Sequence, residues 1–395
     1  MIITNKDNII HENNISFKEK PNLKYKENIV KDMNFSYWIS ETFDIYYPKE
    51  NITEPHLIYP INIGSQINII RIKDKKLIKS LKGQENFFEI IKIFYNKENQ
   101  HNYLVSSDWD KIVFIWDLDD NYKLLQTIRT QYSNYIYSFQ LLFKYNYIIT
   151  STVGLNDNTD YSKIFMLTDG KFFRNIANTN QIETLYSLIW EKNFDEFYYI
   201  ELCYEKIIIH NLLTDEIYSV LETRIEESCG VYYLYGFISN NNKYLFSSSK
   251  EGHIIIWDLY KKTLIKSFQF NDSSFYSIVP CSFEIINYYN ENDKNYQRNI
   301  YYILIVDKNK KCFNCLRIRF KQEFEFIYYK QCINKIGEEE FDDYNMVSKY
   351  QYNENNIKYM KTFLHPIYKE AILSCDEEGN IDLWENIKSF KLSYI

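Results

Sequence analysis

Glycine is scarce in this chain, with nine residues among 395. Phosphate-binding motifs such as the P-loop and the dinucleotide fingerprint need closely spaced glycines, because the backbone must approach the phosphate groups directly. Neither motif occurs here, and the HExxH, GxSxG and protein-kinase signatures are absent too. We therefore expect a protein that is not an enzyme and that needs neither a cofactor nor a metal ion.

Clusters of positive charge are also missing. The net charge is −7, the pI is about 5.6, and no block rich in lysine and arginine stands out. A surface that binds nucleic acid needs a basic patch to neutralise phosphates. We therefore expect no nucleic-acid partner.

Long apolar segments and paired cysteines are absent as well. No segment approaches the run of roughly 18 apolar residues that a spanning helix needs, so no membrane span is expected. The first ten residues, MIITNKDNII, lack the apolar core of a secretion signal. The seven cysteines are scattered and odd in number, which is typical of reduced thiols. We predict a soluble cytoplasmic protein, with a nuclear location as the alternative.

Short β-type segments repeat along the chain. Residues 103–117 read YLVSSDWDKIVFIWD, residues 244–258 read YLFSSSKEGHIIIWD, and residues 371–385 read AILSCDEEGNIDLWE. Each has an apolar strand that ends in serine, a polar turn, and a second apolar strand that ends in Trp-Asp or Trp-Glu. Apolar runs of this length between polar turns favour an all-β fold.

Less regular copies fill the gaps between these three segments. Residues 147–169 place Thr168 at the tryptophan position, and residues 197–212 place His210 there. Polar insertions at about 287–299 and 335–356 account for the longer spacing near the end. The repeats give seven units, centred near residues 60, 107, 150, 203, 248, 306 and 375.

The pattern resembles the WD-repeat family, also called WD40, in a divergent form. The second unit opens with Lys82-Gly83-Gln84, where the family usually has Gly-His, and Asp110 precedes Trp116 by the family's six residues. The resemblance implies an all-β propeller, with seven four-stranded antiparallel blades in residues 35–395 after an N-terminal arm of residues 1–34.

The resemblance also implies a hydrogen-bonded network inside each well-matched blade, made by a serine, an acidic turn residue and the tryptophan. These residues have a structural role, since a buried indole N–H needs an acceptor and a buried carboxylate needs donors. The implied networks are Ser106, Asp110 and Trp116; Ser247, Glu251 and Trp257; and Ser374, Glu378 and Trp384.

An open ring of blades would leave sheet edges exposed, so one terminal segment must complete the last blade. Two segments have β character: residues 389–394 at the C-terminus and residues 22–30 in the N-terminal arm. We prefer the C-terminal segment, and keep the N-terminal one as the alternative.

Few residues suggest site chemistry. Cys312 and Cys315 form a lone CxxC on an expected strand, where residues three apart face opposite sides, so a zinc site is disfavoured. His210 lies at a blade-core position and is expected to be a packed imidazole. The run Glu338–Asp343 is expected to be a solvated loop, with a recognition element as the alternative.

Function is therefore expected to lie in the surface loops. Trp109, in the polar turn before Asp110, is the main candidate for an interaction surface, followed by Tyr132 and Lys250. We predict a non-enzymatic scaffold or adaptor for protein or peptide partners, monomeric within a larger complex. The alternatives are a reader of modified peptides or lipid headgroups, which needs a basic pocket or an aromatic cage, and a propeller hydrolase with channel carboxylates.

Overall fold

The computed structural model divides the chain into two compact units, residues 33–282 and residues 1–32 with 283–395. The residues described are 23–30, 43–61, 66–83, 88–132, 135–152, 162–176, 184–193, 195–203, 206–222, 231–237, 244–249, 253–269, 283–288, 300–307, 312–320, 324–330, 357–365, 369–376 and 379–386.

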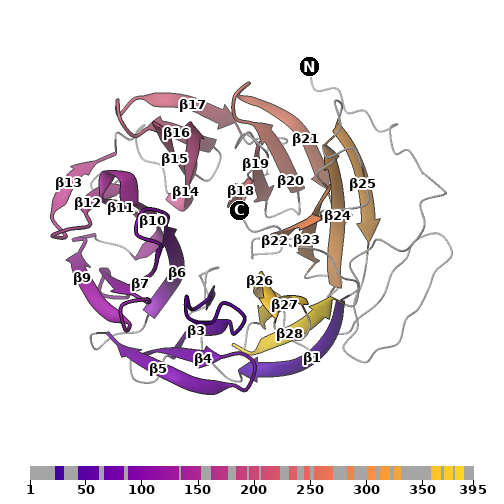
Figure 1. Cartoon of the computed structure of the whole chain (residues 1–395). Helices are drawn as coiled ribbons and strands as arrows, with labels where there is room; N and C mark the ends of the chain where they lie inside the picture. The colour runs from indigo at the N-terminus through magenta and orange to yellow at the C-terminus, as the bar shows by residue number, and fades with distance from the viewer. Residues whose placement is uncertain are drawn as a thin grey trace. The chain divides into compact units, whose positions relative to one another are not determined.

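The larger unit, residues 33–282, contains five antiparallel sheets of four strands, each formed by strands that follow one another in sequence (Figure 1). The first sheet is β2 (Asp44–Tyr46), β3 (His56–Ile61), β4 (Gln66–Arg71) and β5 (Lys76–Lys82). The second is β6 (Phe88–Asn96), β7 (His101–Asp108), β8 (Ile112–Asp117) and β9 (Lys123–Arg129). The third is β10 (Ile136–Leu142), β11 (Tyr147–Thr152), β12 (Lys163–Met166) and β13 (Phe172–Asn175), with the short 3-10 helix η2 (Phe143–Tyr145) between its first two strands. The fourth is β14 (Thr184–Asn193), β15 (Glu196–Cys203), β16 (Lys206–Asn211) and β17 (Ile217–Glu222), and the fifth is β18 (Val231–Phe237), β19 (Tyr244–Ser249), β20 (His253–Asp258) and β21 (Thr263–Gln269).

Neighbouring sheets of this unit pack face to face through apolar side chains. Successive residues of a strand point to opposite faces, so each sheet contributes to the core on both of its sides. Leu104 of β7 packs toward the first sheet, whereas Val105 packs toward the third. Ile149 and Tyr199 belong to a further cluster between the third and fourth sheets.

The acidic residue that follows the tryptophan stabilises the turn between the third and fourth strands of a sheet. The Asp117 Oδ1 atom accepts hydrogen bonds from the backbone N–H groups of Asp119 and Asp120, both at 3.0 Å. Asp258 and Asn211 accept equivalent backbone bonds in the fifth and fourth sheets. A short polar side chain that bonds the backbone two and three residues ahead stabilises a tight turn.

The smaller unit, residues 1–32 with 283–395, contains two four-stranded antiparallel sheets in its described part. One is formed by β22 (Phe283–Tyr288), β23 (Ile300–Asp307), β24 (Cys312–Phe320) and β25 (Phe324–Lys330). The other has the order β1-β28-β27-β26, with β1 (Leu23–Val30), β26 (Ile357–His365), β27 (Lys369–Asp376) and β28 (Ile381–Asn386).

The last sheet is completed by the N-terminal strand. β1 pairs antiparallel with β28, with Leu23 opposite Asn386 and Val30 opposite Ile381. The expectation that residues 389–394 fill this position is therefore wrong, because β1 already occupies the free edge of β28. Residues 389–394 themselves lie outside the described residues.

The described residues thus form seven four-stranded sheets and no α-helix, and each predicted unit centre falls within a different sheet. The all-β fold made of repeated four-stranded antiparallel sheets is that of a β-propeller.

Candidate functional site

The tryptophans of two matched sheets are held by a serine, as the repeat pattern implies. The Trp257 Nε1 atom donates to the Ser247 Oγ atom at 2.9 Å, and Trp384 donates to Ser374 at 2.8 Å. All four side chains are buried. Glu251 and Glu378, the acidic residues expected to complete these networks, lie outside the described residues.

The second sheet departs from this arrangement. Trp116 is buried and stacks on Phe114 with ring centroids 5.5 Å apart. The Ser106 Oγ atom is buried and has no hydrogen-bond partner. Ser106 is therefore not the acceptor for an indole here, although it occupies the same position on the second strand as Ser247.

In the second sheet, the buried carboxylate beside the turn between β7 and β8 is that of Asp108, and the network role expected for Asp110 stays a prediction. Asp110 is exposed, whereas Asp108 is buried and its Oδ1 atom accepts the backbone N–H of Ile112 at 2.9 Å. Burial raises the pKa of Asp108 to about 6, against the lowering effect of that bond. The physical reason is strand alternation: Asp108 ends β7 on the same face as Ser106, while Asp110 belongs to the turn.

The fourth sheet replaces the tryptophan by His210. His210 is fully buried, and its Nε2 atom lies 3.0 Å from the Glu201 Oε2 atom. The other oxygen of Glu201 accepts a hydrogen bond from Ser162, whose hydroxyl also lies 3.3 Å from the Tyr199 hydroxyl. This group stabilises the interior between the third and fourth sheets. The sequence placed His210 correctly in the core but gave no sign of Glu201, which lies nine residues before it.

The third sheet shows that Thr168 does not take the tryptophan position. Phe165 of β12 pairs with Ile148 of β11, just as Trp116 pairs with Leu104 in the second sheet. Phe165 is buried, whereas Thr168 follows the strand and accepts a bond from Asn146 at its surface. The tryptophan position of this sheet is therefore filled by Phe165.

Tyr132 is not part of a surface, contrary to the sequence-based expectation. It is 5% exposed, and its hydroxyl donates to the Thr150 carbonyl at 2.7 Å. The same hydroxyl accepts the backbone N–H of Lys163 at 3.1 Å, and the Lys163 ammonium lies 4.1 Å from the ring centroid. Tyr132 instead joins the connection after β9 to the third sheet.

Trp109 does lie at the surface. Its side chain is 39% exposed and contacts Tyr135, which is 42% exposed, with ring centroids 5.8 Å apart. The Lys111 ammonium lies 6.0 Å from the Tyr135 centroid. We call Trp109 and Tyr135 the aromatic pair. Lys250, the third residue expected at an interaction surface, lies outside the described residues.

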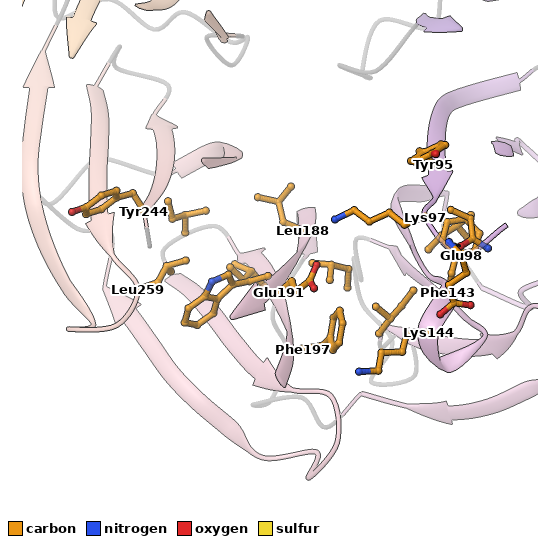
Figure 2. Close-up of a pocket in the computed structure, with 17 residues that line it drawn as sticks. Tyr95, Lys97, Glu98, Phe143, Lys144, Leu188, Glu191, Phe197, Tyr244 and Leu259 are labelled. Carbon is orange, nitrogen blue, oxygen red and sulfur yellow. Dashed lines mark hydrogen bonds between the residues drawn. The ribbon is translucent and has the colours of Figure 1, made fainter. Parts of the chain in front are cut away.

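A second candidate surface is an apolar groove of about 420 Å³, at the opposite end of the strands from the aromatic pair. Figure 2 shows the groove, with Lys97 and Leu188 facing each other across it. Apolar side chains make up most of the lining, including Leu141, Phe143, Leu188, Trp190, Phe197 and Leu245. Its charged residues are Lys97, Glu98, Lys144 and Glu191, and the described lining residues include no histidine or cysteine.

The two surfaces lie on different faces because turns in an antiparallel sheet alternate between its two ends. The apolar groove includes the turn between β6 and β7, whereas Trp109 lies in the turn between β7 and β8. Tyr95, 54% exposed, marks the first of these ends in the second sheet.

The remaining sequence features are the two cysteines of the CxxC, the acidic run and the two polar insertions. Cys312 and Cys315 lie on β24, while the run Glu338–Asp343, most of the insertion at 287–299 and all of the insertion at 335–356 lie outside the described residues. In the described part of the chain, no three His, Cys, Asp or Glu side chains are grouped to hold a metal ion. No helix in that part is long and apolar enough to span a membrane.

Comparison with known proteins yields one family. The family model described as WD domain, G-beta repeat, matches residues 76–117 and 221–258. The first match covers β5 to β8 and the second covers the region around Trp257. No match to the chain is found among curated proteins.

Proposed function

Because the chain carries WD repeats on a β-propeller fold, we propose that it is a non-enzymatic adaptor that binds protein partners. WD repeats generally mediate protein–protein interaction, and propellers of this family are typically not enzymes. The proposed binding face is the one that bears the turn between β7 and β8.

The exposed aromatic pair is the observation that carries this proposal. Trp109 and Tyr135 lie in separate connections, yet they come together with both rings more than a third exposed. Exposed aromatic surface is unfavourable in water, and tryptophan and tyrosine are enriched among residues that dominate binding energy. Lys111 beside them supplies a cation that a partner would meet at the same place.

The test is affinity purification of the tagged full-length chain and its Trp109→Ala variant from native cells, with quantitative mass spectrometry of the bound proteins. Removing an aromatic hot spot costs about 2 kcal/mol or more, which is roughly a thirtyfold loss of affinity. We expect the proteins captured by the wild type to be depleted from the variant.

Tyr95→Ala is the matched control, since it removes an exposed aromatic ring from the opposite end of the same sheet. Capture that survives Trp109→Ala would overturn the proposal. If capture is then lost with Tyr95→Ala, partners bind at the apolar groove instead.

We also propose that the protein works in the cytoplasm as a monomeric subunit of a complex. Cys203 is a buried thiol outside any disulfide, which supports a reducing compartment. Light scattering of the purified chain is expected to give the monomer mass of 48.1 kDa, and a stable dimer would contradict this part of the proposal.

A further inference from the structure

The fourth and fifth sheets of the larger unit surround a lysine ammonium with aromatic rings, at the end of the sheets that bears the apolar groove. The Lys192 ammonium lies 5.6 Å from the ring centroid of Tyr198 and 5.3 Å from that of Tyr218. It lies 5.8 Å from the ring centroid of Tyr260 in the fifth sheet. The Trp190 ring contacts the same three tyrosine rings, with centroids 5.0, 6.0 and 5.6 Å away. We call Trp190, Tyr198, Tyr218 and Tyr260 the aromatic cage.

Irregular strand pairing brings the lysine and one of the rings together. The pairing of β14 with β15 shifts register at Lys192, and the pairing of β16 with β17 shifts register at Tyr218. Such a bulge changes the direction of the side chain that it contains. The second sheet has the same shift in its fourth strand, but the residue there is Leu125, which is 44% exposed. A tyrosine at this position therefore adds a ring to the cage in the fourth sheet, which a leucine cannot do.

The aromatic cage reaches the solvent. The Lys192 side chain is 19% exposed, and its ammonium lies 3.1 Å from a carboxylate oxygen of Glu196, a side chain that is 43% exposed. Tyr260 is 37% exposed, and its hydroxyl donates to the Lys192 carbonyl at 3.2 Å. An ion pair this close to water contributes little to stability, so Glu196 holds the ammonium only weakly.

A second lysine fixes the rim of the cage. The Lys262 ammonium donates to the Tyr218 carbonyl at 2.9 Å and lies 3.8 Å from the centroid of the Tyr218 ring. Replacing the Lys192 ammonium by another cation leaves the number of charges beside Lys262 and Glu196 unchanged. The exchange therefore adds no repulsion at this site.

Aromatic rings favour a methylated ammonium over an unmodified one. The faces of the rings attract a cation, and they offer no acceptor as strong as water for the three N–H groups of a lysine. A trimethylammonium has no N–H group and presents apolar methyl groups, so it loses less when it leaves water. Trp190 also lines the apolar groove, which places apolar surface next to the cage.

We propose that the aromatic cage binds the trimethyllysine side chain of a protein partner, and that Lys192 occupies the cage until the partner displaces it. The apolar groove contacts a residue next to the trimethyllysine. This inference rests on the proposed adaptor function in taking a protein as the ligand, but its site is separate from the aromatic pair.

The experiment measures fluorescence anisotropy of labelled peptides with the full-length protein and its Lys192→Ala variant. The peptides have capped ends and the sequence GLXLG. Residue X is trimethyllysine, lysine, or the uncharged analogue in which a carbon atom replaces the trimethylated nitrogen. We expect Lys192→Ala to bind the trimethyllysine peptide at least about fivefold more tightly than either other peptide. The wild type is expected to bind it about fivefold or more weakly than the variant does, because Lys192 competes from within the chain.

Variants of the cage are made in the Lys192→Ala background. Tyr218→Leu is expected to weaken binding of the trimethyllysine peptide by about fivefold or more, whereas Tyr218→Phe keeps the ring and the binding. Leu125→Ala is the matched control, because it changes the corresponding position of the second sheet, outside the cage. Tyr260→Leu alters an exposed ring of the cage and replaces Tyr218→Leu if that variant does not fold.

Equal binding of the trimethyllysine peptide and its uncharged analogue would overturn the inference, as would equal binding of the trimethyllysine peptide by the wild type and Lys192→Ala. Binding to phosphatidylcholine vesicles that depends on Tyr218, without peptide binding, would overturn it and indicate a membrane surface. Either failure leaves the loss of partners with Trp109→Ala intact. Methylation-dependent peptide binding with normal capture by Trp109→Ala would contradict only the adaptor face.

Discussion

The fourth and fifth sheets of the larger unit fill the same core position with different side chains. In the fifth sheet, Trp257 faces Leu245 on the neighbouring strand and donates to Ser247, two residues further along that strand. In the fourth sheet, His210 faces Tyr199 and bonds Glu201 two residues further along. The strand register is the same, so Glu201 and His210 correspond to Ser247 and Trp257.

The comparison shows that the position requires a hydrogen-bonded pair across two strands and not a particular residue. The repeat is hard to recognise in the sequence of the fourth sheet because both residues of the pair differ from the serine and tryptophan of the fifth sheet. The exchange also places an ionisable pair in the interior, and a buried carboxylate is costly unless its oxygens are bonded. Ser162, just before β12, supplies the bond to the second oxygen of Glu201.

The largest expected effect comes from breaking the pair in the fourth sheet. His210→Leu leaves the buried Glu201 without its histidine and is expected to lower the free energy of unfolding by about 3–5 kcal/mol. A urea titration followed by tryptophan fluorescence measures this change.

The control replaces both partners. Glu201→Leu combined with His210→Leu removes the buried carboxylate, and the double variant is expected to be more stable than His210→Leu alone. If the double variant is less stable than His210→Leu, the unpaired carboxylate of Glu201 is not the cause of the stability loss in the single variant.

A smaller effect is expected from the serine of the fifth sheet. Ser247→Ala leaves the buried indole N–H of Trp257 without its acceptor, at a cost of about 1–3 kcal/mol. Ser106→Ala at the matching position of the second sheet is expected to leave stability unchanged or to raise it, because the variant loses no hydrogen bond and removes a buried hydroxyl without a partner. Urea titrations of both variants measure the two changes in stability. Equal losses in the two variants would contradict the prediction.

The sequence predicted the sheets well because their signal is local. Each well-matched segment, such as residues 244–258, contains two apolar runs separated by a polar turn. The structure has a β-strand at each of these apolar runs. The completion of the last sheet was predicted wrongly because β1 pairs with β28 across more than 350 residues, where short-range patterns carry no information.

The candidate site was predicted less well, for two different reasons. The sequence predicts Tyr132 as a surface loop residue. Its hydroxyl instead donates to the Thr150 carbonyl in the next sheet, and this contact depends on how the two sheets pack. Asp110 was expected in the network from the family spacing alone, and the buried Asp108, on the same face of β7 as Ser106, was not anticipated. Tyr135 was not anticipated, since its meeting with Trp109 brings together two connections that are separate in sequence.

Asp108 extends the comparison of buried carboxylates to pH. Both oxygens of Glu201 are bonded, whereas the Asp108 Oδ2 atom is buried without a partner. Burial raises the pKa of Asp108 from 3.8 to about 6, so the folded protein holds this proton more tightly than the unfolded chain does. The contribution of Asp108 to the free energy of unfolding therefore falls as the pH rises from about 4 to about 6, and is constant above that.

Asp108→Asn removes this titration while it keeps an oxygen that accepts the Ile112 N–H. We expect the stability of the variant relative to the wild type to increase between pH 4 and pH 6 and then to level off, as measured by urea titrations across that range. Asp110→Asn controls for the loss of one negative charge in the same turn. The same pH dependence in both variants would mean that burial of Asp108 is not the cause.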